Sequence, residues 1–242
     1  MKSRIKKDFW LLNRAVAHRG LHGEGVGENT LTAYSLAIQN GYPIEMDVQL
    51  TKDGVPVCFH DDSLLRVTGE NSLIWDKTYE EIKHLKISGT GDGIPTFEQF
   101  LSFVDGKVPL LIEIKQQRTA KEGIEQKVID ALKGYKGEYV IQSFDPFVMM
   151  RVRKINPSII RGQLGGGASK SNLPFIKRLV VNKLLLNFLS KPDFINYELG
   201  GAPLKSKLPT VYWTVRTEEQ KNRLEKLGAN FVFENVTPSN NG

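Results

Sequence analysis

Short apolar runs rich in β-branched residues alternate with helical patterns along the 242-residue chain. This alternation is typical of βαβ units, in which crossover helices join parallel strands. The length also suits one α/β barrel. The expected strands are Ala15–Arg19, Pro43–Leu50, Val55–His60, Pro109–Lys115, Tyr139–Phe144, Ile159–Gln163, Phe194–Tyr197, Val211–Val215 and Phe231–Glu234.

Nine strands are one too many for an eight-stranded barrel, and the turn Thr51–Gly54 indicates which strand is extra. Parallel neighbours need a crossover of about a dozen residues, and this turn is far shorter. We therefore expect Val55–His60 to return antiparallel to the second strand. The predicted fold is an α/β TIM (β/α)8 barrel with a β-hairpin extension after its second strand.

The stretch 61–107 is longer than one crossover needs, and we expect it to form a small insertion over the catalytic mouth. No linker or internal repeat divides the chain, so a single domain over residues 1–242 is predicted. We expect helices at 30–40, 78–86, 96–103 and 217–227. Capping boxes are expected at Thr78/Glu81, Thr96/Gln99 and Thr217/Gln220.

The net charge of +6 and the pI near 9.2 favour anionic partners such as phosphates, anionic lipid or nucleic acid. The basic residues are scattered rather than clustered with stacking aromatics, which argues against nucleic acid. A lone cysteine, Cys58, cannot form an intrachain disulfide. The apolar patch Phe9–Leu12 is too short for a signal peptide, and no run reaches the ~20 residues of a membrane span. A cytoplasmic protein is expected.

Acidic side chains recur at alternate positions on two expected strands. Glu45 and Asp47 share one face of the second strand, and Glu113 and Lys115 share one face of the fourth. Converging carboxylates lose hydration and repel one another, which a hard divalent cation would relieve. The alternative is a buried salt-bridge cluster in which Lys115 and Arg19 neutralise the acids.

Two histidines follow expected strands at the end where barrel enzymes keep reacting groups. His18 ends the first strand and His60 ends the hairpin arm. Histidine titrates near neutrality and can exchange protons during catalysis. A single histidine is often structural, but the joint placement of these two with the acids favours catalysis. His22 and His84 are explained adequately as solvated polar residues.

An ordered series of motifs resembles the glycerophosphodiester phosphodiesterase family over nearly the whole chain. A single motif such as His18-Arg19-Gly20 would carry little weight, but the ordered set is highly specific. The motifs are Ala17-His18-Arg19-Gly20, Glu28-Asn29-Thr30, Glu45-Met46-Asp47-Val48, Thr51-Lys52-Asp53-Gly54, His60-Asp61, Ile94-Pro95-Thr96, Ile112-Glu113-Ile114-Lys115, Gln142-Ser143-Phe144 and Trp213-Thr214-Val215.

The resemblance implies a TIM barrel with a small insertion and a divalent cation, with Mg or Ca expected and Mn as the alternative. It places the cation on Glu45, Asp47 and Glu113, and assigns acid/base work to His18 and His60. It also implies that Arg19 and Lys115 hold phosphate oxygens of the substrate. Further substrate-binding candidates in the matched motifs are Gln142 and Trp213.

The implied reaction hydrolyses a glycerophosphodiester, a small molecule, to glycerol 3-phosphate and an alcohol. The nucleophile would be the neighbouring hydroxyl of the glycerol. One alternative is a related barrel phospholipase acting on lysophospholipid or phosphoinositide. Another is a non-catalytic phosphate- or lipid-binding barrel. Such a barrel should lack one of the histidines or carboxylates, and this sequence has all of them.

Binding of the segment Leu173–Leu189 to a lipid surface would favour the phospholipase alternative. The segment combines Lys177, Arg178 and Lys183 with many apolar residues. The apolar residues nearly circle the expected helix, which favours an outer barrel helix or a subunit contact. A weak peripheral membrane contact is the alternative.

Overall fold

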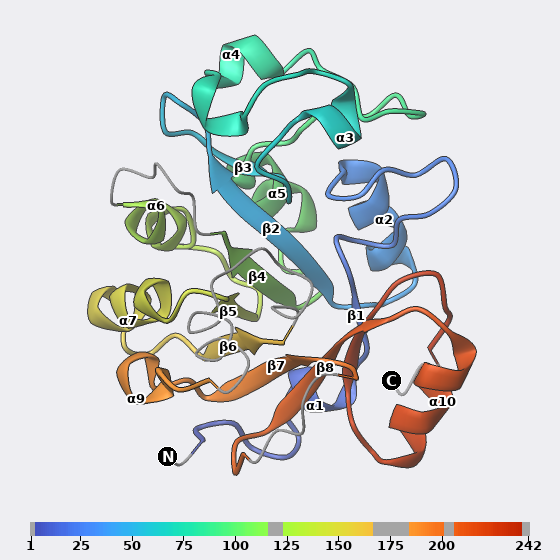
Figure 1. Cartoon of the computed structure of the whole chain (residues 1–242), viewed down its shortest axis with the longest axis vertical. Coiled ribbons are helices and arrows are strands. Elements are labelled where there is room, and N and C mark those ends of the chain that lie inside the picture. Colours follow the sequence, from blue (N-terminus) through green and yellow to red (C-terminus); the bar gives the residue numbers. More distant parts are fainter. Residues whose placement is uncertain (1–2, 116–122, 167–183, 201–205, 239–242) are drawn as a thin grey trace. The chain divides into compact units, whose positions relative to one another are not determined.

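The computed structural model describes residues 3–115, 123–166, 184–200 and 206–238. It divides into two compact units, one formed by residues 17–139 and the other by residues 1–16 together with 140–242. Each unit alternates strands with helices along the chain (Figure 1).

The unit 17–139 is built around β2, whose seven residues are all buried. β4 lies parallel to β2, with Asp47 opposite Glu113, and Ala17 of β1 lies parallel opposite Ile44. The elements are β1 Val16–Ala17, α2 Leu31–Gln39, β2 Ile44–Leu50, β3 Pro56–Cys58, α3 Leu65–Thr68, the 3-10 helix η1 Ile74–Asp76, α4 Tyr79–Ile82, α5 Phe97–Val104, β4 Leu110–Ile114 and α6 Ile124–Ala131.

The short strand β3 pairs antiparallel with β2, placing Val48 opposite Cys58 and Leu50 opposite Pro56. The predicted hairpin is therefore confirmed. β3 and the chain that follows it share a hydrophobic core. Its buried members are Val57, Phe59, Leu64, Val67, Ile74, Ile82, Ile87 and Ile94.

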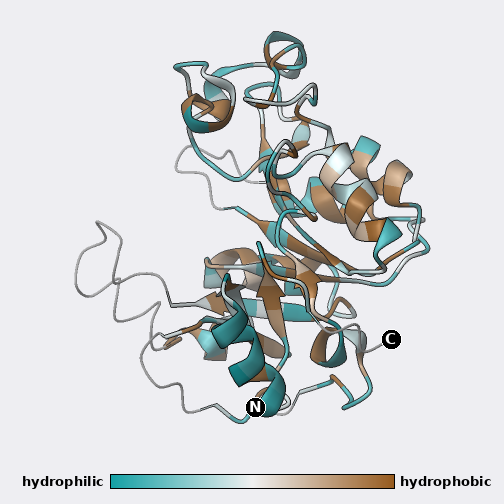
Figure 2. Ribbon diagram, turned by 90° about the vertical axis from the view of Figure 1, so that its right-hand side faces the viewer, coloured by the Kyte–Doolittle hydropathy of each residue, from teal (hydrophilic) through white to brown (hydrophobic). Residues whose placement is uncertain are grey.

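The second unit carries five successive parallel strands, with each neighbour in the chain also a neighbour in the sheet. Most of its strands are rich in apolar residues, whereas α10 is hydrophilic along most of its length (Figure 2). The elements are α1 Trp10–Asn13, β5 Tyr139–Ser143, α7 Pro146–Ile155, β6 Arg161–Gly165, α9 Asn187–Ser190, β7 Phe194–Glu198, β8 Thr210–Val215, α10 Glu218–Lys226 and β9 Phe231–Phe233.

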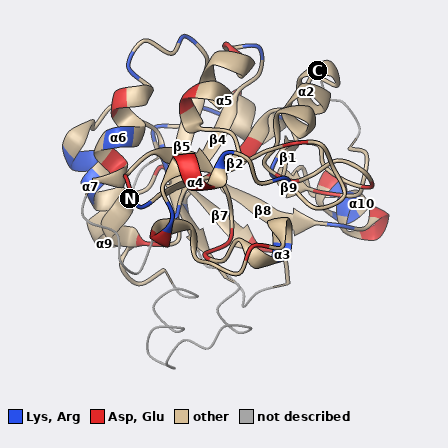
Figure 3. Ribbon diagram, turned by 90° about the horizontal axis from the view of Figure 1, so that it is seen from above, with Lys and Arg blue, Asp and Glu red and all other residues tan. Residues whose placement is uncertain are grey.

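Eight of the described strands, β1, β2 and β4 to β9, are parallel members and alternate with helices. The predicted α/β TIM-barrel class is confirmed, with β3 as the hairpin extension. The single-domain prediction for residues 1–242 stays a prediction. Acidic and basic residues are interspersed along α10 (Figure 3). Within the described part of the chain, no helix is long and apolar enough to cross a bilayer.

Local signals predicted helix starts better than helix ends. Thr78 and Thr96 form complete capping boxes with Glu81 and Gln99. Thr217 caps α10, but Gln220 Oε1 accepts from the backbone N–H of Arg216 instead, so this predicted box is wrong.

The predicted helix 78–86 is too long, because α4 ends at Ile82. A turn follows in which Leu85 N–H donates to Ile82 O, so His84 is exposed outside the helix.

Two other boundaries differ from prediction for backbone reasons. Arg19 has a φ of 55°, which ends the first strand before it. Most of the segment Leu173–Leu189 lies outside the described residues. Among its described residues, Leu184 has a φ of 52°, and Asn187–Ser190 form the short helix α9. Phe188 of α9 is 64% exposed within the single chain, and the outer barrel helix or subunit contact stays a prediction.

The amino-terminal arm is held to the second unit by the guanidinium of Arg4. Its Nε and Nη2 donate to the two carboxylate oxygens of Asp193 at 2.8 and 2.7 Å. Nη2 also donates to Ile159 O at 2.6 Å, and Nη1 donates to Pro157 O at 2.8 Å. Because Asp193 precedes β7 and is 3% exposed, this fork fixes the arm beside the start of β7.

Replacing Arg4 with alanine should lower the free energy of unfolding by about 1 to 3 kcal/mol, because a buried carboxylate loses a bidentate partner. Urea unfolding measures the change. Lys7→Ala is the matched control, since Lys7 lies exposed on the same arm, and it should leave the midpoint unchanged. Equal midpoints for Arg4→Ala and the native chain would contradict this account.

Candidate active site

Three buried carboxylates lie close together within the unit 17–139. Glu45 and Asp47 come from β2 and Glu113 from β4, and one oxygen of each lies within 4.8 Å of the others. Glu45 and Asp47 are 2% and 0% exposed. The predicted convergence is therefore observed, and the parallel register of Asp47 and Glu113 produces it.

Two cations contact the acids. Lys115 Nζ lies 2.7 Å from Glu113 Oε1 and 3.2 Å from Asp47 Oδ1. Arg19 Nε lies 3.5 Å from Asp47 Oδ2, and its backbone N–H donates to Glu45 Oε2 at 2.9 Å. The ion pairs anticipated from the sequence thus exist, but among the described residues these two cations face three carboxylates.

The excess negative charge falls on Glu45. Burial raises the pKa of Glu45 well above its ordinary value, and the nearby carboxylates of Asp47 and Glu113 raise it further. Burial also opposes the charge on Asp47, but Lys115, His60 and Arg19 outweigh it and hold the pKa of Asp47 well below its ordinary value. Three oxygen donors with uncompensated charge fit a hard divalent cation.

Asn29 supports Asp47 and was not among the residues predicted for the site. Its Nδ2 donates to Asp47 Oδ2 at 2.9 Å, while its Oδ1 accepts from the hydroxyl of Tyr34 at 3.0 Å. A φ of 54° gives Asn29 the left-handed conformation that this arrangement uses. The motif Glu28-Asn29-Thr30 was the available signal, but sequence alone does not show what an asparagine contacts.

Gly20 lets the loop after β1 approach α2. Its φ is +78°, and a Cβ at this position would lie 2.8 Å from the Cβ of Ala33. A side chain there would displace either the loop or the helix. Gly20 therefore fixes the path of the backbone that carries His18 and Arg19.

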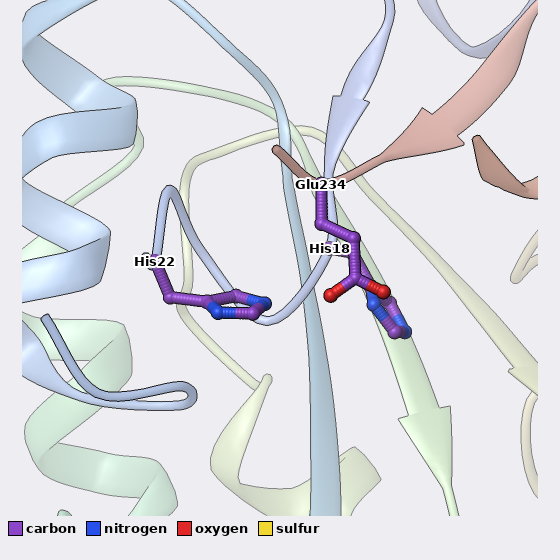
Figure 4. Close-up of side chains that lie close together, drawn as sticks. All are labelled: His18, His22 and Glu234. Carbon is purple, nitrogen blue, oxygen red and sulfur yellow. The ribbon is translucent and has the colours of Figure 1, made fainter. Parts of the chain in front are cut away.

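The two predicted histidines have different surroundings. His60 Nδ1 lies 2.6 Å from Asp61 Oδ1, which favours the tautomer with its proton on Nδ1 and leaves Nε2 for chemistry. His18 Nε2 lies 3.9 Å from Glu45 Oε2. The ring of His22 lies 6.5 Å from that of His18, between centroids, on the same loop (Figure 4).

A further ion-pair chain runs beside the histidines. Arg19 Nη1 donates to Glu28 Oε1 at 2.7 Å, and Arg66 Nη2 donates to the same oxygen at 2.6 Å. Burial opposes the charge on Glu28, but the two arginines hold its pKa below the ordinary value. Neither Glu28 nor Arg66 was predicted as a site residue.

Gln142 and Trp213, the two other predicted substrate-binding residues, lie in the second unit. Both contact Asn196 of β7: Gln142 Oε1 accepts from Asn196 Nδ2 at 2.9 Å, and Trp213 Nε1 donates to Asn196 O at 3.3 Å. Phe144 meets Trp213 edge to face, with ring centroids 5.5 Å apart. Strands β5, β7 and β8 therefore bring these side chains together.

Comparison with known proteins finds relatives that cover most of this chain. A glycerophosphodiester phosphodiesterase of Caldanaerobacter subterraneus subsp. tengcongensis is 33% identical over 230 residues, covering 90% of this chain and 92% of its own length. One of Bacillus subtilis is 31% identical over 250 residues, covering 91% and 82%.

Among solved structures, an Oleispira antarctica phosphodiesterase in complex with the product sn-glycerol-3-phosphate has a TM-score of 0.74 and 24% identity, covering 92% of each chain. A glycerophosphodiester phosphodiesterase from Agrobacterium tumefaciens has a TM-score of 0.69 and 21% identity, covering 92% and 96%. These structural likenesses concern the fold. The model of the glycerophosphoryl diester phosphodiesterase family matches residues 18–237, and the chain belongs to that family.

Proposed function

We propose that this chain hydrolyses glycerophosphodiesters to glycerol 3-phosphate and an alcohol with the help of one divalent cation held by Glu45, Asp47 and Glu113. The observation that carries the proposal is the buried carboxylate cluster, whose charge exceeds that of the cations that contact it in the described part of the chain. The names of the relatives support the substrate class. Mg or Ca is expected from the all-oxygen donor set, with Mn as the alternative.

The cation would stabilise negative charge on the phosphate and make a nearby hydroxyl easier to deprotonate. Arg19 and Lys115 would neutralise phosphate oxygens. Burial lowers the pKa of Lys115, but Asp47 and Glu113 outweigh it, so its pKa is raised and the ammonium stays charged. Fixed positive charges in a buried site stabilise a phosphodiester transition state without reorganising.

His18 and His60 would exchange the protons. One histidine takes the proton of the glycerol 2-hydroxyl as that oxygen attacks phosphorus, and the other protonates the departing alcohol oxygen. The product of this step is a cyclic phosphate. In the second step the histidines exchange roles as water opens the ring and restores the starting enzyme. Asp61 would hold His60 with its proton on Nδ1.

Two further residues are proposed to bind the substrate. Gln142 and Trp213 remain the proposed substrate-binding residues, supported by their shared contact with Asn196.

We also propose a single catalytic domain over residues 1–242. A cytoplasmic location rests on the buried, unpaired thiol of Cys58.

The first test of this proposal concerns stability. Because the folded pKa of Glu45 is raised, the folded chain retains a proton that the unfolded chain loses near the ordinary value of 4.5. In chelator, stability should therefore fall as pH rises above that value. Glu45→Gln removes this penalty and should be more stable than the native chain by about 1 to 4 kcal/mol near neutral pH. The difference should vanish toward about pH 4.

Thermal unfolding with and without cation completes the measurement. Mg, Ca or Mn should raise the melting temperature of the native chain and have little effect on Glu45→Gln. Glu98→Gln, at an exposed position on α5, should respond like the native chain. If none of the three ions changes the melting temperature of the native chain, the metal assignment is wrong.

The second test concerns proton transfer. His18→Ala and His60→Ala should each lower kcat by about 10²- to 10⁴-fold on glycerophosphocholine, the usual range for a general acid or base. His84→Ala is the control, because His84 is exposed in the turn after α4. Loss of activity only through a higher KM would assign these histidines to binding instead.

The third test identifies the nucleophile. A substrate analogue with hydrogen in place of the glycerol 2-hydroxyl should act as a competitive inhibitor that does not turn over, because the attacking oxygen is missing. Phosphorus NMR should detect a cyclic glycerophosphate during slow turnover by His18→Ala or His60→Ala. Hydrolysis of the deoxy analogue at the rate of the natural substrate would show direct attack by water.

A further inference from the structure

His60 and Asp61 lie in a stretch without regular structure, between the end of β3 at Cys58 and the start of α3 at Leu65. The backbone of this stretch is fixed from β2. Gln49 Nε2 donates to the carbonyls of Phe59, His60 and Asp61 at 3.1, 2.8 and 2.8 Å. Gln49 itself is fully buried. The backbone of the pair is therefore anchored, but its side chains need a separate support.

Arg66 on α3 supplies that support through the three nitrogens of its guanidinium group. Nε donates to Asp61 Oδ2 at 2.5 Å. Nη1 and Nη2 donate to Glu28 Oε2 and Oε1 at 2.9 and 2.6 Å. Asp61 thus has one oxygen on Arg66 and the other on His60 Nδ1.

We propose that Arg66 is a positioning residue that fixes the Asp61 carboxylate and, through it, the orientation and tautomer of the His60 ring. The proposal rests on the acid/base role proposed above for His60. Arg66 itself does not touch the substrate in this scheme. Its Nε holds Oδ2 of Asp61, so Oδ1 stays directed at His60 Nδ1 and His60 Nε2 stays available.

Glu28 makes the support rigid because it holds the guanidinium plane. The side chain of Arg66 is 52% exposed, and a long exposed side chain has little reason to stay in one rotamer. A bidentate bond to Glu28, which is also bound by Arg19, fixes that plane. Lysine donates from a single nitrogen and has no planar fork, so it cannot reproduce the arrangement of three donor nitrogens that contacts Asp61 and Glu28.

A double-mutant cycle separates positioning from general structural damage. Arg66→Gln should lower kcat on glycerophosphocholine by about 10- to 100-fold, the usual effect of losing a group that orients a histidine. KM should change by less than about twofold. In the His60→Ala background, the same substitution should have almost no further effect on kcat.

Two matched variants test the geometry of the guanidinium. Arg66→Lys retains the charge but should recover only part of the lost kcat. Lys77→Gln is the control within the insertion 61–107. It removes a surface ion pair in which Lys77 Nζ lies 3.9 Å from Glu70 Oε1, and it should leave kcat unchanged. An equal loss of kcat from Arg66→Gln with and without His60 would overturn the proposal.

Nitrogen-15 NMR of the histidine rings gives a readout independent of turnover. The His60 signals, assigned by their disappearance in His60→Gln, should show the proton on Nδ1 in the native chain. In Arg66→Gln they should show a mixture of tautomers. An unchanged tautomer would overturn the proposal. If His60→Ala retained native kcat, the proposed function of His60 would fail, while the NMR comparison would still decide whether Arg66 orients its ring.

Discussion

The confinement of three carboxylates in a buried site is the constraint on which the rest of the unit 17–139 depends. Glu45, Asp47 and Glu113 lose hydration and repel one another. Lys115 and Arg19 compensate only part of that charge. Such a cluster costs stability unless a cation completes it, so its presence in the centre of two parallel strands points to function rather than to folding.

The backbone near the acids is shaped by the same requirement. Arg19 and Asn29 both have left-handed φ values, which are uncommon outside glycine. Asn29 N–H donates to Arg19 O, which joins the two ends of the loop after β1. The unusual conformations bring Arg19 Nε and Asn29 Nδ2 to the same oxygen of Asp47. The strained backbone of the loop after β1 thus places the groups that stabilise the charge of Asp47 in β2.

Sequence reasoning succeeded where side-chain direction follows from strand periodicity. The alternation in β2 and β4 was enough to predict that Glu45, Asp47 and Glu113 converge. It failed where contacts join irregular segments. Arg66 reaches Glu28 across 38 residues of chain, and no periodicity relates a loop before α2 to a helix of four residues. The sequence motif marked Glu28 and Asn29 without showing which side chains they bind.

In the proposal made above, the insertion after β3 carries Arg66, the residue that positions His60. Leu64 and Val67 are buried in the hydrophobic core of this stretch, while Arg66 between them points outward to Asp61 and Glu28. Packing of its neighbours therefore fixes the start of the Arg66 side chain, and the carboxylates fix its end. A residue held at both ends can orient a histidine from an exposed position, where charge alone would contribute little.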